Sequence, residues 1–143
     1  MPRIYLVRHA KAEKSSPSGG DAARRLTPEG RSRFAAHARA LALPLRRIVT
    51  SPFARARETA DLLAAATGAT VEEDGALASG ASTGKELLAL ARRKGDGTAL
   101  VGHNPEIAEA IGLAGAVDAV PPGSVAEVEL DDSGVALAWL RAP

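Results

Sequence analysis

Short apolar runs alternate along the chain with polar segments that contain proline or glycine. Three of these runs predict buried strands, and a fourth, more polar run at residues 70–72 is a further candidate. The three runs are residues 4–7, 48–50 and 98–101. Two alternating segments near the end of the chain, residues 125–130 and 135–140, flank Asp-Asp-Ser-Gly and predict a hairpin.

Helix signals fall between the strands. A polar residue followed by proline favours a helix start because it supplies a cap and a preset first turn. Such pairs occur at Thr27-Pro28, Ser51-Pro52 and Asn104-Pro105. Apolar residues at helical spacing follow the first pair, namely Phe34, Ala38, Leu41 and Leu45, and a further helix is expected over residues 85–94. Strands that alternate with helices predict a single α/β domain spanning residues 1–143, with three α/β/α layers and a mostly parallel central sheet that ends in an antiparallel hairpin.

The composition of the chain argues against several classes of function. The 143 residues carry a net charge of +1, with 45% apolar residues, 3% aromatic residues and no cysteine. The near-balanced charge argues against a nucleic-acid-coating protein, and the scarcity of aromatics leaves no platform for stacking bases. No apolar stretch approaches the roughly 20 residues of a membrane span or forms a signal-peptide core. A cytoplasmic protein with no nucleic-acid or membrane partner is therefore expected.

Candidate chemistry lies at the strand ends. Arg8 and His9 follow the first strand, Arg55 comes shortly after the second, and His103 follows the run at 98–101. In a parallel sheet, ligands bind at the carboxyl ends of the strands. If these strands are parallel neighbours, the four side chains converge on one edge.

Arg55 breaks a local rule, since cations are disfavoured in the first turn of a helix. One interpretation is an exposed arginine paired with Glu58 or with a carboxylate from elsewhere in the chain. The other is an anion site, where helix N–H groups and a guanidinium face the same phosphate. Two of the three histidines also lie at strand ends, which favours catalysis over a structural role for His9 and His103. His37, the third, is expected on a solvated helix face.

Four segments resemble motifs of the histidine phosphatase superfamily, also called the phosphoglycerate mutase-like superfamily. They are residues 6–13 (LVRHAKAE), 26–30 (LTPEG), 50–56 (TSPFARA) and 101–105 (VGHNP). They occur in the family's order and cover most of the chain. The short length and the forms of the Arg-His-Ala and Gly-His-Asn-Pro motifs look like the branch of small bacterial phosphohistidine phosphatases of the SixA type.

The resemblance implies roles for four residues. His9 is the nucleophile that becomes transiently phosphorylated, Arg8 and Arg55 clamp the phosphoryl oxygens, and His103 donates to the transferring group. No metal or other cofactor is needed in that scheme. The expected partners are a phosphohistidine-bearing protein or a small phosphorylated substrate, with inorganic phosphate as the product.

One departure from the family pattern bears on the substrate. Many members place a glutamate proton donor where this chain reads residues 74–80 (DGALASG). Its absence favours N–P over O–P substrates, because an alkoxide leaving group usually requires a positioned acid. Glu13, Asp21 and Glu106 are possible substitutes, although each also fits a structural role: loop charge, partner of Arg24 or Arg25, and first-turn helix acid. A phosphatase or mutase for small esters, or a non-catalytic phosphate-binding module, stays as an alternative.

Overall fold

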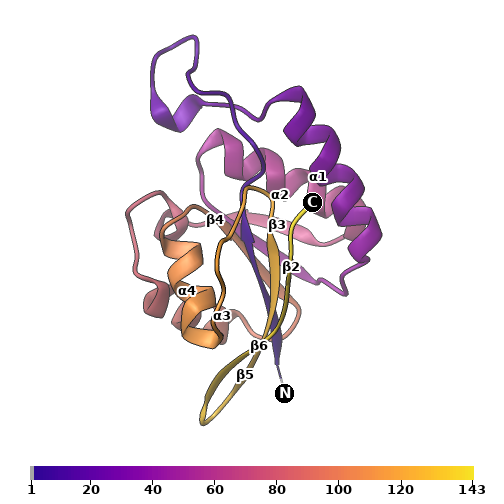
Figure 1. Cartoon of the computed structure of the whole chain (residues 1–143), viewed down its shortest axis with the longest axis vertical. Coiled ribbons are helices and arrows are strands. Elements are labelled where there is room, and N and C mark those ends of the chain that lie inside the picture. Colours follow the sequence, from indigo (N-terminus) through magenta and orange to yellow (C-terminus); the bar gives the residue numbers. More distant parts are fainter. Residues whose placement is uncertain (1) are drawn as a thin grey trace.

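The computed structural model describes residues 2–143 and shows four helices and six strands, all of the strands in one sheet (Figure 1). The strands are β1 (Arg3–Arg8), β2 (Arg47–Thr50), β3 (Thr70–Glu73), β4 (Thr98–Gly102), β5 (Val125–Asp131) and β6 (Gly134–Arg141). The helices are α1 (Pro28–Leu41), α2 (Ala54–Thr67), α3 (Gly84–Lys94) and α4 (Glu106–Ala114), with the 3-10 turns η1 (Asp21–Ala23) and η2 (Gly75–Leu77).

The sheet has the strand order β3-β2-β4-β1-β5-β6. The first four strands along the chain run parallel, while β5 lies antiparallel to β1 and β6 lies antiparallel to β5. The predicted α/β class, the mostly parallel sheet and the C-terminal hairpin are therefore confirmed. The register places Arg8 beside Gly102 and Thr50 beside Val101, so β2, β4 and β1 end side by side at one edge.

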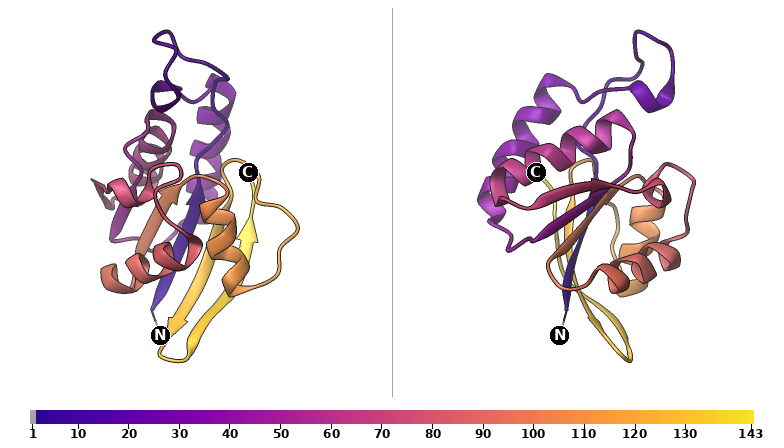
Figure 2. Two further views of the ribbon diagram at one scale, coloured as in Figure 1. Left: turned by 90° about the vertical axis from the view of Figure 1, so that its left-hand side faces the viewer. Right: turned by 180° about the vertical axis from the view of Figure 1, so that it is seen from behind.

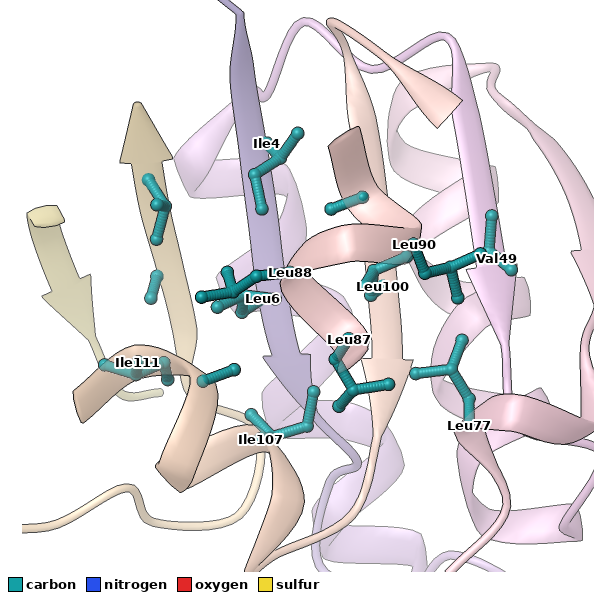
Figure 3. Close-up of a cluster of buried hydrophobic side chains, with 14 of the residues drawn as sticks. Ile4, Leu6, Val49, Leu77, Leu87, Leu88, Leu90, Leu100, Ile107 and Ile111 are labelled. Atoms are coloured by element: carbon teal, nitrogen blue, oxygen red, sulfur yellow. The ribbon is translucent and has the colours of Figure 1, made fainter. Parts of the chain in front are cut away.

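Helices cover both faces of the sheet (Figure 2). On one face, α1 and α2 bury a cluster that includes Tyr5 and Val7, whereas α3 and α4 cover Ile4 and Leu6 on the other (Figure 3). Successive residues of a strand point to opposite faces, so a strand buried on both sides is apolar throughout. This explains the continuous apolar run at the start of the chain and completes the expected three layers.

Three helix boundaries differ from the prediction. The smallest difference is at α4, which begins at Glu106 with Pro105, rather than Asn104, as its cap residue. Helix α1 ends at Leu41, where Ala42 adopts the left-handed conformation, so Leu45 belongs to the following connection although it is still buried. Helix α2 begins at Ala54 with Phe53 as its cap residue, so Ser51-Pro52 is not the helix start. The Ser51 hydroxyl does accept a hydrogen bond from the Phe53 N–H (3.1 Å), but it also has a partner outside the helix.

Residues 13–25 form an excursion that projects from the body of the protein between β1 and α1 (Figure 1). An isolated bridge between Ala12 and Leu26 closes its base, and η1 lies within it. The excursion reaches back to the carboxyl edge of the sheet through a contact between η1 and α2. Within residues 2–143, no helix has both the length and the apolar character that crossing a membrane requires.

Candidate active site

The carboxyl ends of β1, β2 and β4 border a pocket of about 440 Å³. Arg8, His9, Arg55 and His103 all line it, so the structure brings the four residues singled out in the sequence into one place. The remaining lining residues are Lys11, Ala12, Asp21, Arg24, Ser79, Asn104 and Pro122. Every strand end that the sequence singled out therefore contributes to the same pocket.

The His9 ring has a defined tautomer. Its Nδ1 lies 2.7 Å from the carbonyl oxygen of Ala10. A carbonyl can only accept, so Nδ1 carries the hydrogen and Nε2 is left with its lone pair. Burial, together with the charges of Arg55 and Arg8, lowers the pKa of His9 to about 4. The ring is therefore neutral near pH 7, the state that a nitrogen nucleophile needs.

His103 is almost fully buried, at 2% exposure, and its ring centroid lies 5.2 Å from that of His9. Its Nε2 lies 2.8 Å from Ser51 Oγ. When the Ser51 hydroxyl donates to Nε2, the ring hydrogen sits on Nδ1 and is available to a ligand oxygen. Burial is the main cause that lowers the pKa of His103 to about 3, and the neighbouring His9 and Arg55 add to it.

One backbone oxygen holds a side chain from the end of β1 and a side chain that follows β4. The Val120 carbonyl accepts hydrogen bonds from Arg8 Nη1 (2.9 Å) and from Asn104 Nδ2 (3.1 Å). The second bond fixes the orientation of the Asn104 amide, because only its nitrogen can donate to a carbonyl. Both side chains are thus held from the segment between α4 and β5.

Arg55 is buried, with 4% of its side chain exposed, and its partner is Asp21. Arg55 Nη1 donates to the Asp21 carbonyl oxygen (2.8 Å), and Nη2 donates to the Asp21 carboxylate (3.1 Å). Glu58, the acid nearest in sequence, instead accepts from Arg25, Arg31 and the Leu26 N–H. The first interpretation of Arg55 is therefore wrong about its exposure and about Glu58. It is right that a carboxylate from elsewhere in the chain pairs with it, because Asp21 comes from the excursion.

Buried polar atoms without a partner concentrate in this pocket. Among residues 2–143, five buried side-chain nitrogen or oxygen atoms lack a hydrogen bond, and four of them belong to pocket residues. The four are Arg8 Nε, Arg55 Nε, His103 Nδ1 and Asn104 Oδ1. Buried polar groups in native proteins are nearly always paired. Three nitrogens without partners, two of them in guanidinium groups and one in the His103 ring, form the environment expected of a site for a tetrahedral oxyanion.

The three acids considered as proton donors lie in different places. Asp21 lines the pocket; burial raises its pKa, but the hydrogen bonds and charges of Arg55 and Arg24 outweigh this effect and hold the pKa below its usual value. Glu106 begins α4 and accepts a hydrogen bond from the Gly80 N–H (2.8 Å). Glu13 is exposed on the excursion, and neither Glu13 nor Glu106 lines the pocket. The single carboxylate in the pocket is therefore held in the ionised form.

His37 lies outside the site. It is half-buried rather than solvated, because its ring packs edge-on to Phe34 and its Nε2 lies 3.2 Å from the Arg141 carbonyl oxygen. Within residues 2–143, no group of three or more histidine, aspartate or glutamate side chains is arranged to hold a metal ion.

Several pocket residues were missed by reasoning from the sequence. Arg24, Ser79 and Pro122 carry no local signal, because they come from loops whose paths depend on the tertiary fold. Ser51 does not line the pocket but bonds His103, and its position directly after a strand is the signal that could have indicated this role. The Val120 carbonyl belongs to the backbone and has no signature in the sequence.

Comparisons with known proteins agree with this geometry. A sequence model of the histidine phosphatase superfamily (branch 1) matches residues 4–109. No curated protein matches the chain significantly in sequence. A solved structure from Agrobacterium tumefaciens, assigned as the phosphohistidine phosphatase SixA, aligns with a TM-score of 0.84 and 26% identity over 99% of this chain and 98% of its own.

Two further structures share the fold at lower identity. SixA complexed with tungstate aligns with a TM-score of 0.80 and 20% identity, over 99% of this chain and 97% of its own. A variant phosphoserine phosphatase of Entamoeba histolytica, complexed with phosphoserine, aligns with a TM-score of 0.77 and 16% identity, over 99% of this chain and 98% of its own. Because the family match covers well over half of the chain and includes three of the strand ends that form the pocket, the chain belongs to the histidine phosphatase superfamily.

Proposed function

We propose that this protein is a phosphatase that works through a phosphorylated His9 and that its substrate is phosphohistidine on a partner protein. The observation that carries the proposal is the tautomer of His9. The bond from Nδ1 to the Ala10 carbonyl leaves an unprotonated Nε2 in a pocket lined by three arginines. A neutral, oriented imidazole in a cationic pocket can attack a phosphoryl group.

In the first step, His9 Nε2 forms a bond to phosphorus as the bond from phosphorus to the leaving nitrogen breaks. Arg8 and Arg55 balance the charge on the phosphoryl oxygens, and His103 Nδ1 donates a hydrogen bond to one of them. The leaving imidazole, already protonated by solvent on its other ring nitrogen, departs neutral, and the electron pair of the broken N–P bond stays on the nitrogen that had carried phosphorus. Phosphoryl transfer asks little covalent chemistry of the protein beyond this positioning and charge stabilisation.

In the second step, water attacks phosphorus, the Nε2–P bond breaks, and inorganic phosphate leaves while His9 regains its neutral form. The Ala10 carbonyl holds the ring through both steps. A fixed ring keeps the attacking atom aligned, and such alignment lowers the barrier of a transfer step.

The preference for an N–P bond rests on the acids near the pocket. The one carboxylate among the lining residues, Asp21, has a lowered pKa and is bonded to Arg55 and Arg24. An ionised carboxylate cannot protonate an alkoxide, so esters with a poor leaving group should react slowly. A phosphoimidazole can take its proton from solvent before departure, and it places no such demand on the protein.

Activity on small phosphate esters is the second candidate. It is favoured by the shared fold of the Entamoeba histolytica protein, which is complexed with phosphoserine. A phosphate-binding module without turnover is the third, because the arginine pocket alone would suffice for binding.

The test compares phosphate release from a phosphohistidine-bearing protein and from phosphoserine, an ester whose alkoxide is a poor leaving group, with wild type, His9→Ala and His37→Ala. We expect release from phosphohistidine that is lost in His9→Ala and kept in His37→Ala, together with an acid-labile phosphate on His9. Faster turnover of the ester would favour the second candidate. Tight phosphate binding without any turnover or phosphoenzyme would establish the third.

A further inference from the structure

Asp21 places a negative charge at the most buried cation of the site. Its carboxylate bonds Arg55 Nη2 through Oδ2 and Arg24 Nε through Oδ1 (2.9 Å). The Asp21 side chain is 61% exposed, whereas the Arg55 side chain is 4% exposed. The carboxylate therefore covers Arg55 from the solvent side, and both residues line the same pocket.

The same contact joins residues 14–23 of the excursion to the body of the protein. Among residues 2–143, the hydrogen bonds that join residues 14–23 to residues outside 13–25 are the two from Arg55 to Asp21. The other hydrogen bonds of this stretch stay within the excursion, such as those from Ala23 and Arg24 N–H to the carbonyls of Gly20 and Asp21. Residues 14–23 are thus joined to the body of the protein through Arg55, whereas the base of the excursion is held by the ion pair of Arg25 with Glu58.

We infer that Asp21 is an internal counterion of Arg55 that a substrate phosphoryl group displaces, so that phosphate binding releases residues 14–23 from the edge of the pocket. This inference rests on the proposed function, since it takes the pocket to be the phosphate site. A buried guanidinium without a negative partner is costly, and Asp21 supplies that partner in the empty protein. A phosphoryl group carries about −1.5 to −2 charges and supplies it in the complex.

The Asp21 carboxylate and a phosphoryl group cannot both bind Arg55 without an unfavourable interaction between them. Arg55 Nη1 and Nη2 each already donate to Asp21, and a carboxylate beside a phosphate is repelled. Of the other three cations of the pocket, Arg24 is bonded to Asp21 but Arg8 and Lys11 are not, so a phosphoryl group gains these two while it competes for Arg55. Asp21 therefore lowers the affinity of the pocket for a phosphoryl group. A ligand must carry enough negative charge to displace the Asp21 carboxylate from Arg55.

The test measures binding of inorganic phosphate to wild type, Asp21→Asn and Glu13→Gln by titration calorimetry, at one fixed salt concentration. Asparagine has the shape of aspartate and keeps the backbone carbonyl that Arg55 Nη1 uses, so the fold is retained. Glu13→Gln removes one negative charge from the same excursion, and its side chain does not line the pocket. We expect roughly three- to tenfold tighter phosphate binding in Asp21→Asn and an unchanged Kd in Glu13→Gln.

A second measurement follows the excursion itself. Hydrogen exchange of the Ala23 and Arg24 amides in wild type should become faster when phosphate is added, and in Asp21→Asn it should be fast without phosphate. Weaker phosphate binding in Asp21→Asn would overturn the inference and make Asp21 a residue that positions Arg55. Slower exchange on adding phosphate would also overturn it, because the excursion would then close over the anion. Absence of both phosphate binding and turnover in wild type would instead count against the proposed function.

Discussion

Ser51 Oγ lies 2.8 Å from His103 Nε2, although the two residues are 52 positions apart in the chain. The hydroxyl also accepts the Phe53 N–H at the start of α2, so its own hydrogen is free to point at the ring. One side chain at the end of β2 thus orients the histidine at the end of β4.

The Ser51→Ala variant should therefore lose activity through His103. Without the hydroxyl, His103 Nε2 and the Phe53 N–H lose a buried partner, which should cost about 1–3 kcal/mol of stability. We expect kcat on phosphohistidine to fall roughly 10- to 100-fold because the ring is no longer held. Thr50→Val is the control, since it removes a neighbouring buried hydroxyl that bonds the Ser51 carbonyl and does not contact His103. An equal loss of kcat in both variants would show that the effect is general destabilisation.

Arg55→Lys should impair anion binding even though the charge is kept. Lysine has no planar fork, so it cannot hold a phosphoryl group and a second partner in fixed geometry. We expect phosphate to bind about tenfold or more weakly, measured by calorimetry. Arg57→Lys is the matched control two positions along the same helix, where the side chain is paired at the surface with Asp61 and Glu73. If Arg55→Lys binds phosphate like wild type, Arg55 does not contact the anion.

The histidines of the pocket predict how stability changes with pH. The pKa of His9 is about 4 in the folded protein, below its ordinary value of 6.5, so folding favours the neutral ring. Above pH 6.5 both folded and unfolded chains hold it neutral; as the pH falls from 6.5 towards 4, the unfolded chain takes up the proton first and stability is lost. His103, with a pKa of about 3, adds a loss of the same sign.

Urea unfolding at a series of pH values between 7.5 and 4.5 should show that the free energy of unfolding decreases as the pH falls. In His9→Asn this free energy should decrease less steeply with pH. An NMR titration of the phosphate-free protein should find the His9 ring neutral down to about pH 4. Titration of that ring near pH 6.5 would contradict the burial that the structure shows.

Two helical glycines should respond in opposite ways to alanine. A Cβ at Gly30 would collide with the backbone carbonyl of Lys11, two residues after His9, whereas nothing lies within 4 Å of a Cβ at Gly112 in α4. We expect Gly30→Ala to destabilise by about 1–3 kcal/mol and to lower activity, because the segment after His9 must move. Gly112→Ala should be neutral or stabilising by up to about 1 kcal/mol, by thermal unfolding.

The strand ends were predictable from the sequence because they depend on local pattern. A buried strand reads as an apolar run, and a polar residue after it falls at the edge where parallel strands end. The pattern alone therefore predicts that Arg8, His9 and His103 lie at the carboxyl ends of strands, whatever the strand order. The order β2-β4-β1 then made them neighbours.

The partners of these residues could not be predicted in the same way. Asp21 lies 34 positions from Arg55 in a loop, and its position depends on how the whole excursion folds back. Glu58 is the acid nearest to Arg55 in sequence, but it pairs with Arg25 and Arg31 instead. Ser51 shows the same limit, since local rules gave its capacity for hydrogen bonds but not its bond to His103.

The Val120 carbonyl has a consequence for how this site tolerates sequence change. Because the acceptor shared by Arg8 and Asn104 is a backbone oxygen, exchanging the side chain at position 120 leaves it in place. Inserting or deleting a residue between α4 and β5 would instead shift that oxygen along the chain and release both side chains together. The length of this connection, rather than its composition, is therefore the property that keeps the side chains of Arg8 and Asn104 in a fixed relation.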